Sequence, residues 1–369
     1  MYRCLGIVNV EDDRVQIGEL TNYRTIPAVS FLGRYRVIDF ILSNMVNSGM
    51  DQIKVLVKDK PRSLIEHLGS GTQYDINSKH GNLQILYTDN KITNELYLTD
   101  VGLLKQYETF IDECNADYVV IAPSYMICRI NYQDVIEHHV NSGAEVTVVY
   151  KTVEDADKRF LSCREIEFEG DRVKVIKTSH GSIARKHISL QAYVCKKEKF
   201  LQIIDEAIDQ SPLYTLENYL AYNVDKIDIR AYQYTGYLFC VNSLEDYFNE
   251  SLRLIKYENA KELFDPDWPV YTNSNDSPTA FFSPNAKVKN CLIANGCVVQ
   301  GELENCILGR DVKIKPGAKI KNSLILPSAV VGENVVVENA IIDKHARVEH
   351  VKEVKNEGKI AYVRRRDIV

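Results

Sequence analysis

Short aliphatic runs alternate with segments of helical period over the first two thirds of the chain. Four of these runs are predicted to be buried strands, at residues 3–10, 53–57, 118–122 and 145–150. Residues 36–50 and 133–140 carry helical period instead, and Gly49 is a stop signal for the first of these helices. Strand and helix in rotation predict an α/β domain, with a mainly parallel sheet covered on both faces. Ligands of such folds bind at the carboxyl ends of the strands.

The alternating pattern of strands and helices ends at residue 258. Residues 259–283 are rich in proline, asparagine, serine and aspartate, which is typical of a connector rather than a helix or strand. This stretch holds the only tryptophan of the chain, Trp268, and we expect that side chain to fix the connector to one domain.

A six-residue period marks the remaining residues, 284–369. A small or apolar residue stands two places before an aliphatic one, as in Val312/Ile314 and Ala318/Ile320, and the pairs recur six positions apart. Further pairs with this pattern are Ala286/Val288, Cys297/Val299, Ala329/Val331, Val335/Val337, Ala340/Ile342 and Ala346/Val348. The period is the signature of a hexapeptide β-helix, whereas a β-sandwich has no reason to keep a six-residue step. The predicted domains are therefore 1–258 and 284–369, joined by the connector at 259–283.

The composition of the chain disfavours some classes of partner, namely nucleic acids and membranes. The 369 residues are 45% hydrophobic and 26% charged, as in a globular protein with a substantial core. A net charge of −6 disfavours nucleic acid as a partner. We expect no membrane partner, because no apolar run is long enough to cross a bilayer, and a cytoplasmic location, because the first residues do not resemble a signal peptide. The nine cysteines include no CxxC pair and are expected to be reduced.

A long motif at residues 20–49 carries a family resemblance. It reads LTNYRTIPAVSFLGRYRVIDFILSNMVNSG. This segment closely resembles the LTxxRxKPAVxFxGx(F/Y)R(I/V)IDFxLSNxxNSG segment of glucose-1-phosphate adenylyltransferases, which make ADP-glucose for glycogen and starch. The resemblance implies a Rossmann-like nucleotidyltransferase domain followed by a left-handed parallel β-helix. Both agree with the two sequence patterns, which are the alternating strands and helices and the six-residue period. The chain looks most like the non-catalytic, GlgD-type subunits of that family.

The phosphate-binding loop implied by this resemblance is degenerate. The family has GGxGxRL after the first strand, since glycines let backbone N–H groups turn toward phosphate oxygens. This chain instead has three consecutive carboxylates, Glu11, Asp12 and Asp13, followed by Arg14, and the family arginine is Gln16. Repulsion between like charges costs about 1–4 kcal/mol per close pair, so we expect the loop not to hold a triphosphate.

Three other catalytic positions implied by the resemblance are also altered. The lysine of KPAV is Ile26, and the two aspartates that bind magnesium correspond to Tyr125 and Cys240. The sugar-binding EKP segment falls at Thr178 and Ser179, again without its lysine. Because Mg²⁺ takes hard oxygen ligands, a phenol and a thiol do not replace the aspartates. We therefore expect no catalytic residues and no metal or cofactor in this chain, with Mg²⁺ only in a catalytic partner.

Two arginines of the motif are retained. Arg24 and Arg36 correspond to arginines that lie near the phosphate-binding effector site of the relatives, and Arg364, Arg365 and Arg366 add a positive cluster. Guanidinium groups fork onto phosphate oxygens, so these five residues are the predicted site for a small phosphorylated effector. The alternative is that the last three are ordinary solvated charges.

The sequence thus predicts a regulatory or structural subunit of glucose-1-phosphate adenylyltransferase. Its expected partner is a catalytic subunit, in a hetero-oligomer, and a homo-oligomer is also possible. One alternative is a weakly active adenylyltransferase with a rearranged site. A more distant one is a hexapeptide acyltransferase, whose histidine base would have to be His345 or His350.

Overall fold

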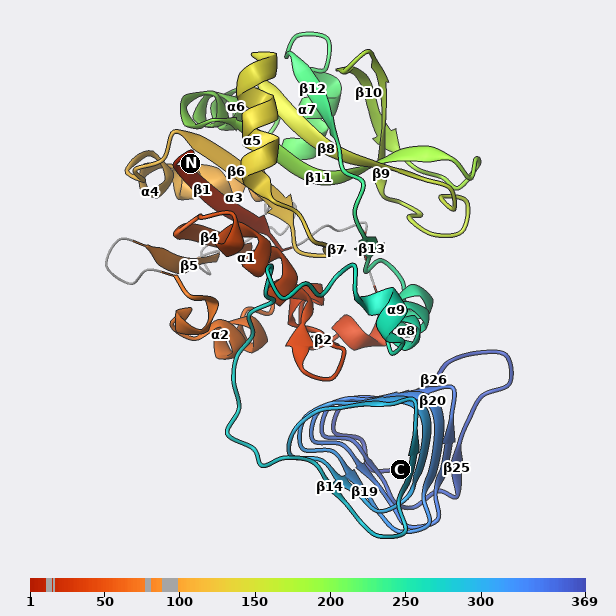
Figure 1. The fold of residues 1–369 in the computed structure, drawn as a ribbon. Coiled ribbons are helices and arrows are strands. Elements are labelled where there is room, and N and C mark those ends of the chain that lie inside the picture. Colours follow the sequence, from red (N-terminus) through yellow and green to blue (C-terminus); the bar gives the residue numbers. More distant parts are fainter. Residues whose placement is uncertain (11–14, 16, 77–80, 88–98) are drawn as a thin grey trace.

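A computed structural model describes residues 1–10, 15, 17–76, 81–87 and 99–369. Within these ranges a nine-stranded sheet forms the centre of the N-terminal part (Figure 1). Its strands, in spatial order, are β5 (Asn82–Tyr87), β4 (Gln52–Val57), β1 (Cys4–Asn9), β6 (Tyr118–Pro123), β11 (Lys186–Lys196), β8 (Val146–Val153), β12 (Ile229–Gln233), β10 (Arg172–Thr178) and β9 (Arg164–Glu169). The four predicted strands are β1, β4, β6 and β8, and each begins and ends within a few residues of its expected limits.

Helices cover both faces of this sheet. One face packs on α1 (Val37–Asn47) and α5 (Tyr132–Ser142), the two helices predicted from the sequence. The other packs on α3 (Asp100–Gln106), α6 (Lys197–Gln210) and α7 (Leu216–Tyr222). The five residues predicted to share one apolar face of α1 are all buried: Val37, Ile38, Ile41, Leu42 and Met45.

The sheet is mixed, so the prediction of a mainly parallel sheet holds only for part of it. β5, β4, β1 and β6 are parallel neighbours, and so are β8 and β12. However, β11 lies between β6 and β8 and runs antiparallel to both. The hairpin of β9 and β10 also adds antiparallel pairs at the edge. A hairpin reverses the chain before β11, so this strand enters the sheet from the opposite end.

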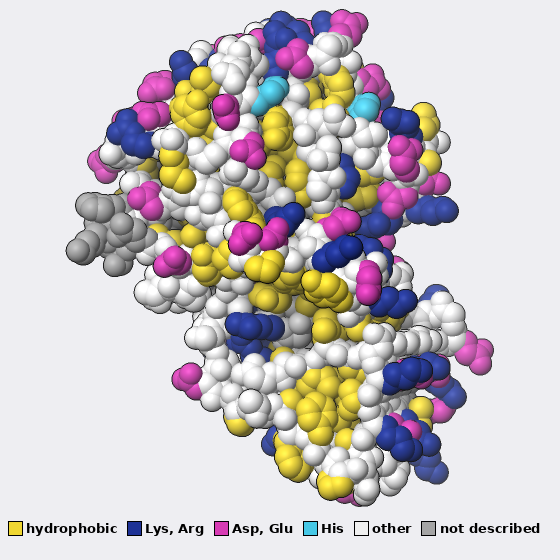
Figure 2. Space-filling model, viewed as in Figure 1, with side chains coloured by type: hydrophobic (Ala, Val, Ile, Leu, Met, Phe, Trp, Pro, Cys, Tyr) yellow, Lys and Arg dark blue, Asp and Glu magenta, His cyan; other side chains and the backbone are white. Residues whose placement is uncertain are grey.

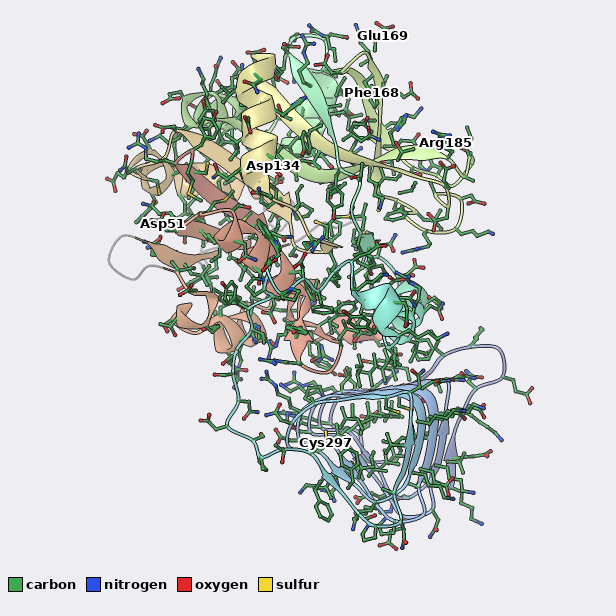
Figure 3. The ribbon with its side chains drawn as sticks, viewed as in Figure 1. Asp51, Asp134, Phe168, Glu169, Arg185 and Cys297 are labelled. Atoms are coloured by element: carbon green, nitrogen blue, oxygen red, sulfur yellow. The ribbon has the colours of Figure 1, made fainter. Side chains whose placement is uncertain are left out.

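Short parallel strands wind into a coil after residue 280 (Figure 1). One wall contains β14 (Phe281–Phe282), β17 (Val298–Val299), β19 (Lys313–Ile314), β21 (Val330–Val331) and β24 (Arg347–Val348). Another contains β15 (Lys287–Lys289), β18 (Glu302–Leu308), β20 (Lys319–Ile325), β22 (Val336–Glu338) and β25 (Glu353–Val354). The small and aliphatic residues of the hexapeptide pattern fill the coil, as for Cys297 in Figure 3, except in its first turn, where Val288 is exposed. This parallel hexapeptide region is consistent with the predicted β-helix.

An asparagine ladder runs along one corner of the coil. Asn290, Asn305, Asn322 and Asn339 stand one above another, each with a positive φ between 45° and 53°. Asn290 Nδ2 donates to Asn305 Oδ1 over 2.6 Å, and Asn305 Nδ2 donates to Asn322 Oδ1 over 3.1 Å. Asparagine tolerates the left-handed region better than most residues, and here its amide also links successive turns.

We expect Asn305→Ala to lower the free energy of unfolding by about 2 kcal/mol, because it loses both ladder bonds and places a Cβ-bearing alkyl residue at positive φ. Asn305→Gly is the matched control, since glycine adopts this φ without strain. Urea unfolding should show the glycine variant losing less than half as much stability. Equal losses for the two variants would contradict a role for backbone strain.

The connector and the coil are both fixed to the N-terminal part. Trp268 Nε1 donates to Asn44 Oδ1 of α1 over 3.0 Å, as expected for the lone tryptophan. Ile307, Leu324, Leu326 and Ile341 of the coil belong to the same buried cluster as residues of the N-terminal sheet. At Gly33, which has a φ of 75°, a Cβ would come within 2.7 Å of the Leu308 carbonyl oxygen of the coil. The two parts therefore meet in a close, continuous contact.

Candidate functional site

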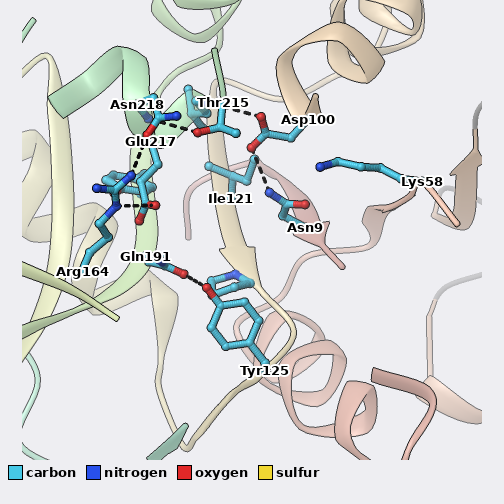
Figure 4. Close-up of a pocket in the computed structure, with 13 residues that line it drawn as sticks. Asn9, Lys58, Asp100, Ile121, Tyr125, Arg164, Gln191, Thr215, Glu217 and Asn218 are labelled. Atoms are coloured by element: carbon cyan, nitrogen blue, oxygen red, sulfur yellow. Dashed lines mark hydrogen bonds and ion pairs between the residues drawn. The ribbon is translucent and has the colours of Figure 1, made fainter. Parts of the chain in front are cut away.

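A pocket lies at the carboxyl ends of the parallel strands, where α/β folds bind ligands (Figure 4). Its volume is about 180 Å³. Asn9 ends β1, Lys58 follows β4 and Pro123 ends β6, so three adjacent strands supply part of its wall. The remaining lining residues are Asp100, Ile121, Tyr125, Arg164, Gln191, Tyr193, Thr215, Leu216, Glu217 and Asn218.

Three charged residues of this pocket, Asp100, Arg164 and Glu217, have partners within the protein. Asp100 accepts hydrogen bonds from Asn9 Nδ2 at 2.9 Å, Val101 N at 2.8 Å and Leu216 N at 3.1 Å, and burial raises the pKa of this carboxyl group. Arg164 Nε donates to Glu217 Oε2 over 2.9 Å. Both carboxylates are therefore held in place by protein donors, in positions that sequence reasoning did not single out.

The two residues predicted to stand at degenerate metal positions, Tyr125 and Cys240, lie side by side. Tyr125 directly precedes β7 (Met126–Cys128), and Cys240 ends β13 (Leu238–Cys240). The two strands pair antiparallel with Cys240 opposite Met126, and Val241 N donates to the Tyr125 carbonyl oxygen over 2.9 Å. The alignment inferred from the resemblance thus places both residues at one location, as a pair of metal ligands would require.

The side chains at this location do not fit a magnesium ion. The Tyr125 side chain is only 2% exposed, and its hydroxyl donates to Gln191 Oε1 inside the pocket (Figure 4). The Cys240 thiol lies 3.4 Å from the thiol of Cys163 in the core. Mg²⁺ prefers several hard oxygen ligands in octahedral geometry, which a phenol and a buried thiol do not provide.

Gln191 was not anticipated from the sequence. It has a φ of 54°, although it is neither glycine nor asparagine, and it lies where the pairing of β11 with β8 shifts register. A glutamine held at positive φ is strained, and strained residues tend to cluster at functional sites. Here that conformation accompanies the contact between the amide oxygen and Tyr125.

The structure describes Ile26 and Thr178, two of the other positions that the resemblance predicts to be altered. Ile26 is buried in the core, in the short helix Ile26–Ala28. Thr178 ends β10, and its hydroxyl accepts a hydrogen bond from Arg164 Nη1 over 3.2 Å. Glu11, Asp12, Asp13, Arg14 and Gln16 lie outside the described residues, so the degenerate loop remains a prediction.

Arg24 forms a buried ion pair within the protein. Its guanidinium is 4% exposed and donates to both carboxylate oxygens of Asp343, a 1% exposed residue of the coil. The same carboxylate accepts from the Tyr362 hydroxyl over 2.7 Å, and Arg24 Nε donates to the Leu20 carbonyl oxygen over 2.9 Å. This arginine therefore joins the N-terminal part to the coil.

Three more cations gather around that junction. Arg36 Nη1 donates to the Ser63 carbonyl oxygen over 2.5 Å, and burial together with Arg24 lowers the pKa of its guanidinium. The Nε of Arg365 is buried and has no hydrogen-bond partner in the part of the chain that the structure describes. Lys344 has no hydrogen bond or ion pair at its ammonium group among the described residues, and burial beside Arg36 and Arg24 lowers its pKa to about 8. The junction thus holds positive charge in excess of its carboxylates.

Sequence reasoning found only part of this cluster. Lys344 was missed, although the neighbouring Asp343 interrupts the apolar hexapeptide pattern and signals a buried charge. Arg364 turns away to pair with Glu19 over 3.0 Å, and Arg366 is exposed near the cluster. The structure therefore brings Arg24, Arg36 and Arg365 together with Lys344 but directs Arg364 elsewhere.

Comparison with known proteins agrees with the motif at residues 20–49. Residues 16–175 match the Nucleotidyl transferase family, and residues 279–359 match the GlmU-like C-terminal hexapeptide family. The chain is 29% identical over 370 residues to "Glycogen biosynthesis protein GlgD" of Bacillus subtilis, which covers 100% of this chain and 97% of that protein. It is also 29% identical over 354 residues to glucose-1-phosphate adenylyltransferase of Fervidobacterium nodosum, covering 95% of this chain and 85% of the relative.

The resemblance to glucose-1-phosphate adenylyltransferases is confirmed. A third relative, the glucose-1-phosphate adenylyltransferase of Clostridioides difficile, is 29% identical over 325 residues, which is 85% of this chain and 83% of that enzyme. The similarity to these adenylyltransferases and to GlgD thus extends through both the α/β sheet and the hexapeptide coil. In the described parts of the chain, no helix is both long and apolar enough to span a bilayer.

Proposed function

We propose that this chain is a regulatory or structural subunit of a glucose-1-phosphate adenylyltransferase, and that it serves ADP-glucose formation for glycogen synthesis without catalysing it. Similarity to GlgD and to the adenylyltransferases supports the pathway. The single observation that carries the non-catalytic role is the pair Tyr125 and Cys240. They lie together where the relatives' aspartates are expected, and neither side chain can serve as a magnesium ligand of the required kind.

The proposal includes a finer description of the fold. We infer an α/β domain at residues 1–258, a connector at 259–283 and a left-handed β-helix at 284–369. The change from helices and long strands to short parallel strands between Tyr257–Ala260 and Phe281–Phe282 supports these limits.

Assembly with a catalytic subunit is the direct test of this role. The first turn of the coil exposes Phe281, Phe282 and Val288, and β14 is an edge strand. Hydrophobic side chains also gather on the face of the coil that Figure 2 shows. Apolar edges of this kind are normally covered by a partner. Co-expressed with a catalytic subunit from the same cell, the chain should give a hetero-oligomer by light scattering and change the catalytic subunit's response to phosphorylated effectors. Two separate species and an unchanged response would contradict the proposal.

A phosphorylated effector is proposed to bind at the basic junction. Lys344 and the Nε of Arg365 supply donors without protein partners among the described residues, and Arg24 and Arg36 add positive charge around them. Several cations around one dianion give a specific site, because charge-assisted hydrogen bonds are the strong ones.

Sulfate is a suitable probe because it stays a dianion across the pH range tested. We expect Lys344→Met to weaken sulfate binding about tenfold in calorimetry, the loss of one charge-assisted hydrogen bond. Binding to the unchanged protein should be strongest below pH 8 and decline as the pH rises through 8, since the depressed pKa of Lys344 lets its ammonium group lose its charge there. The exposed Lys319→Met is the control. A pH profile that is identical in the Lys344 variant and the parent would exclude this role.

A further inference from the structure

Two stacked tyrosines form an exposed aromatic platform on the N-terminal part. The rings of Tyr214 and Tyr222 lie with centroids 5.4 Å apart and planes at 17°. Tyr222, the last residue of α7, is 73% exposed, and Leu213 beside Tyr214 is exposed as well. One face of the Tyr222 ring is thus covered by Tyr214, and the other is available to a ligand. Exposed apolar groups that cluster in this way commonly mark a binding surface.

A groove of about 510 Å³ adjoins this platform. Tyr222 and Ala221 line one side, and the wall continues along β9, β10 and the segment before β11; α7 packs directly against β10 (Figure 1). Ligand sites for small molecules generally have volumes of about 300–1000 Å³. The groove is separate from the basic junction, and it shares only Arg164 and Asn218 with the pocket at the strand ends.

Each of the three Lys and Arg residues lining this groove is paired with a carboxylate, which is either Glu165 in the lining or Glu217 outside it. Arg164 pairs with Glu217 over 2.9 Å, Lys177 pairs with Glu165 over 3.5 Å, and Lys186 also pairs with Glu165. No cation of the groove whose placement is described therefore remains free to bind a phosphate or carboxylate. What the groove does offer is uncharged hydrogen-bonding groups from Thr178, Ser182 and Asn218, beside the imidazole of His180.

We propose that this groove and its tyrosine platform bind an α-1,4-glucan. A glucosyl ring presents apolar C–H groups on its faces and hydroxyl groups around its edge. The first feature matches the free face of Tyr222, and the second matches the neutral donors and acceptors of the groove. A polyhydroxylated neutral chain also needs no free charge, which the paired lining does not supply. The choice of α-linked glucose rests on the proposed role in glycogen synthesis.

Such a site would bind the subunit to glycogen. The proposed catalytic partner would then make ADP-glucose beside the polymer that its glucose extends. Binding would need neither the nucleotide pocket nor a catalytic subunit. The two proposals can therefore fail separately. A chain that binds glucan but does not assemble with a catalytic subunit would refute only the regulatory role, and the reverse result would refute only the glucan site.

Titration of the purified full-length protein with maltoheptaose tests the inference. We expect saturable binding by calorimetry and retardation of the protein in native gels that contain glycogen. Tyr222→Ala should weaken maltoheptaose binding at least tenfold, and Tyr222→Trp should retain it because an indole also stacks. Tyr257→Ala is the matched control, since Tyr257 is 76% exposed and lies outside the groove. Both side chains project into solvent, so circular dichroism should show all variants folded.

Several outcomes would overturn the site. They are an absence of maltoheptaose binding, equal binding by the parent and Tyr222→Ala, and equal loss in Tyr222→Ala and Tyr257→Ala. Cellohexaose binding as tightly as maltoheptaose would refute the preference for α-linked glucose. Tyr222-dependent binding of adenosine without binding of maltoheptaose would show that the platform stacks on bases instead.

Discussion

Purified alone, the protein is expected to form no ADP-glucose from ATP and glucose 1-phosphate in the presence of Mg²⁺. The positions that the family resemblance aligns with two metal-binding aspartates hold a phenol and a thiol, and the phenol is hydrogen-bonded to Gln191 within a pocket of about 180 Å³. A divalent cation that neutralises the phosphates therefore lacks its protein ligands. Coupled detection of pyrophosphate, with an active adenylyltransferase relative assayed in parallel, measures this directly.

Turnover in the usual enzyme range of about 1–1000 per second would contradict the expectation and favour the alternative of an active, rearranged site. We also expect Tyr125→Asp with Cys240→Asp to remain inactive. That variant restores two carboxylates but leaves Ile26 in place of the family lysine and Gln191 at positive φ beside the site. Recovery of activity in this double variant alone would show that metal ligation was the only missing function.

The sequence predicted those features that depend on local pattern. Apolar periodicity located β1, β4, β6, β8, α1 and α5, and the six-residue step located the coil, because both patterns record which side chains a regular element must bury. The position of β11 could not be obtained in this way. Its place between β6 and β8 depends on strand pairing over long sequence separations, which a period within one segment does not encode.

Some residues of the candidate sites were also predicted from the sequence, whereas others were not. The family resemblance aligned Tyr125 and Cys240, which are 115 positions apart, with the two metal-binding aspartates, and the two residues lie side by side in the structure. By contrast, Gln191, Asp100 and Lys344 were not found from the sequence. Each acquires its environment from a contact with a distant segment: Gln191 with Tyr125, Asp100 with Asn9 and Leu216, and Lys344 with the cations of the N-terminal part.

Arg24→Met is expected to destabilise the protein by about 3–5 kcal/mol, because it leaves the Asp343 carboxylate buried without its counter-charge. The chain supplies a matched comparison. Arg364 pairs with Glu19 and also joins the coil to the N-terminal segment, but its side chain is 65% exposed. Water already solvates that pair, so Arg364→Met should cost less than about 1 kcal/mol. Urea unfolding of the two variants separates a buried junction from an exposed one.

The double variant Arg24→Met with Asp343→Leu identifies the cause of the loss. Removing both charges eliminates the stranded carboxylate, although Tyr362 and Lys344 N then lose an acceptor. We therefore expect the double variant to recover a large part of the stability that the single variant loses, as is usual when a buried ion pair is replaced by apolar residues. If Arg24→Met costs no more than Arg364→Met, the ion pair does not stabilise the junction. Arg24 would then be free to serve chiefly as a phosphate ligand, and the same substitution should weaken sulfate binding without affecting unfolding.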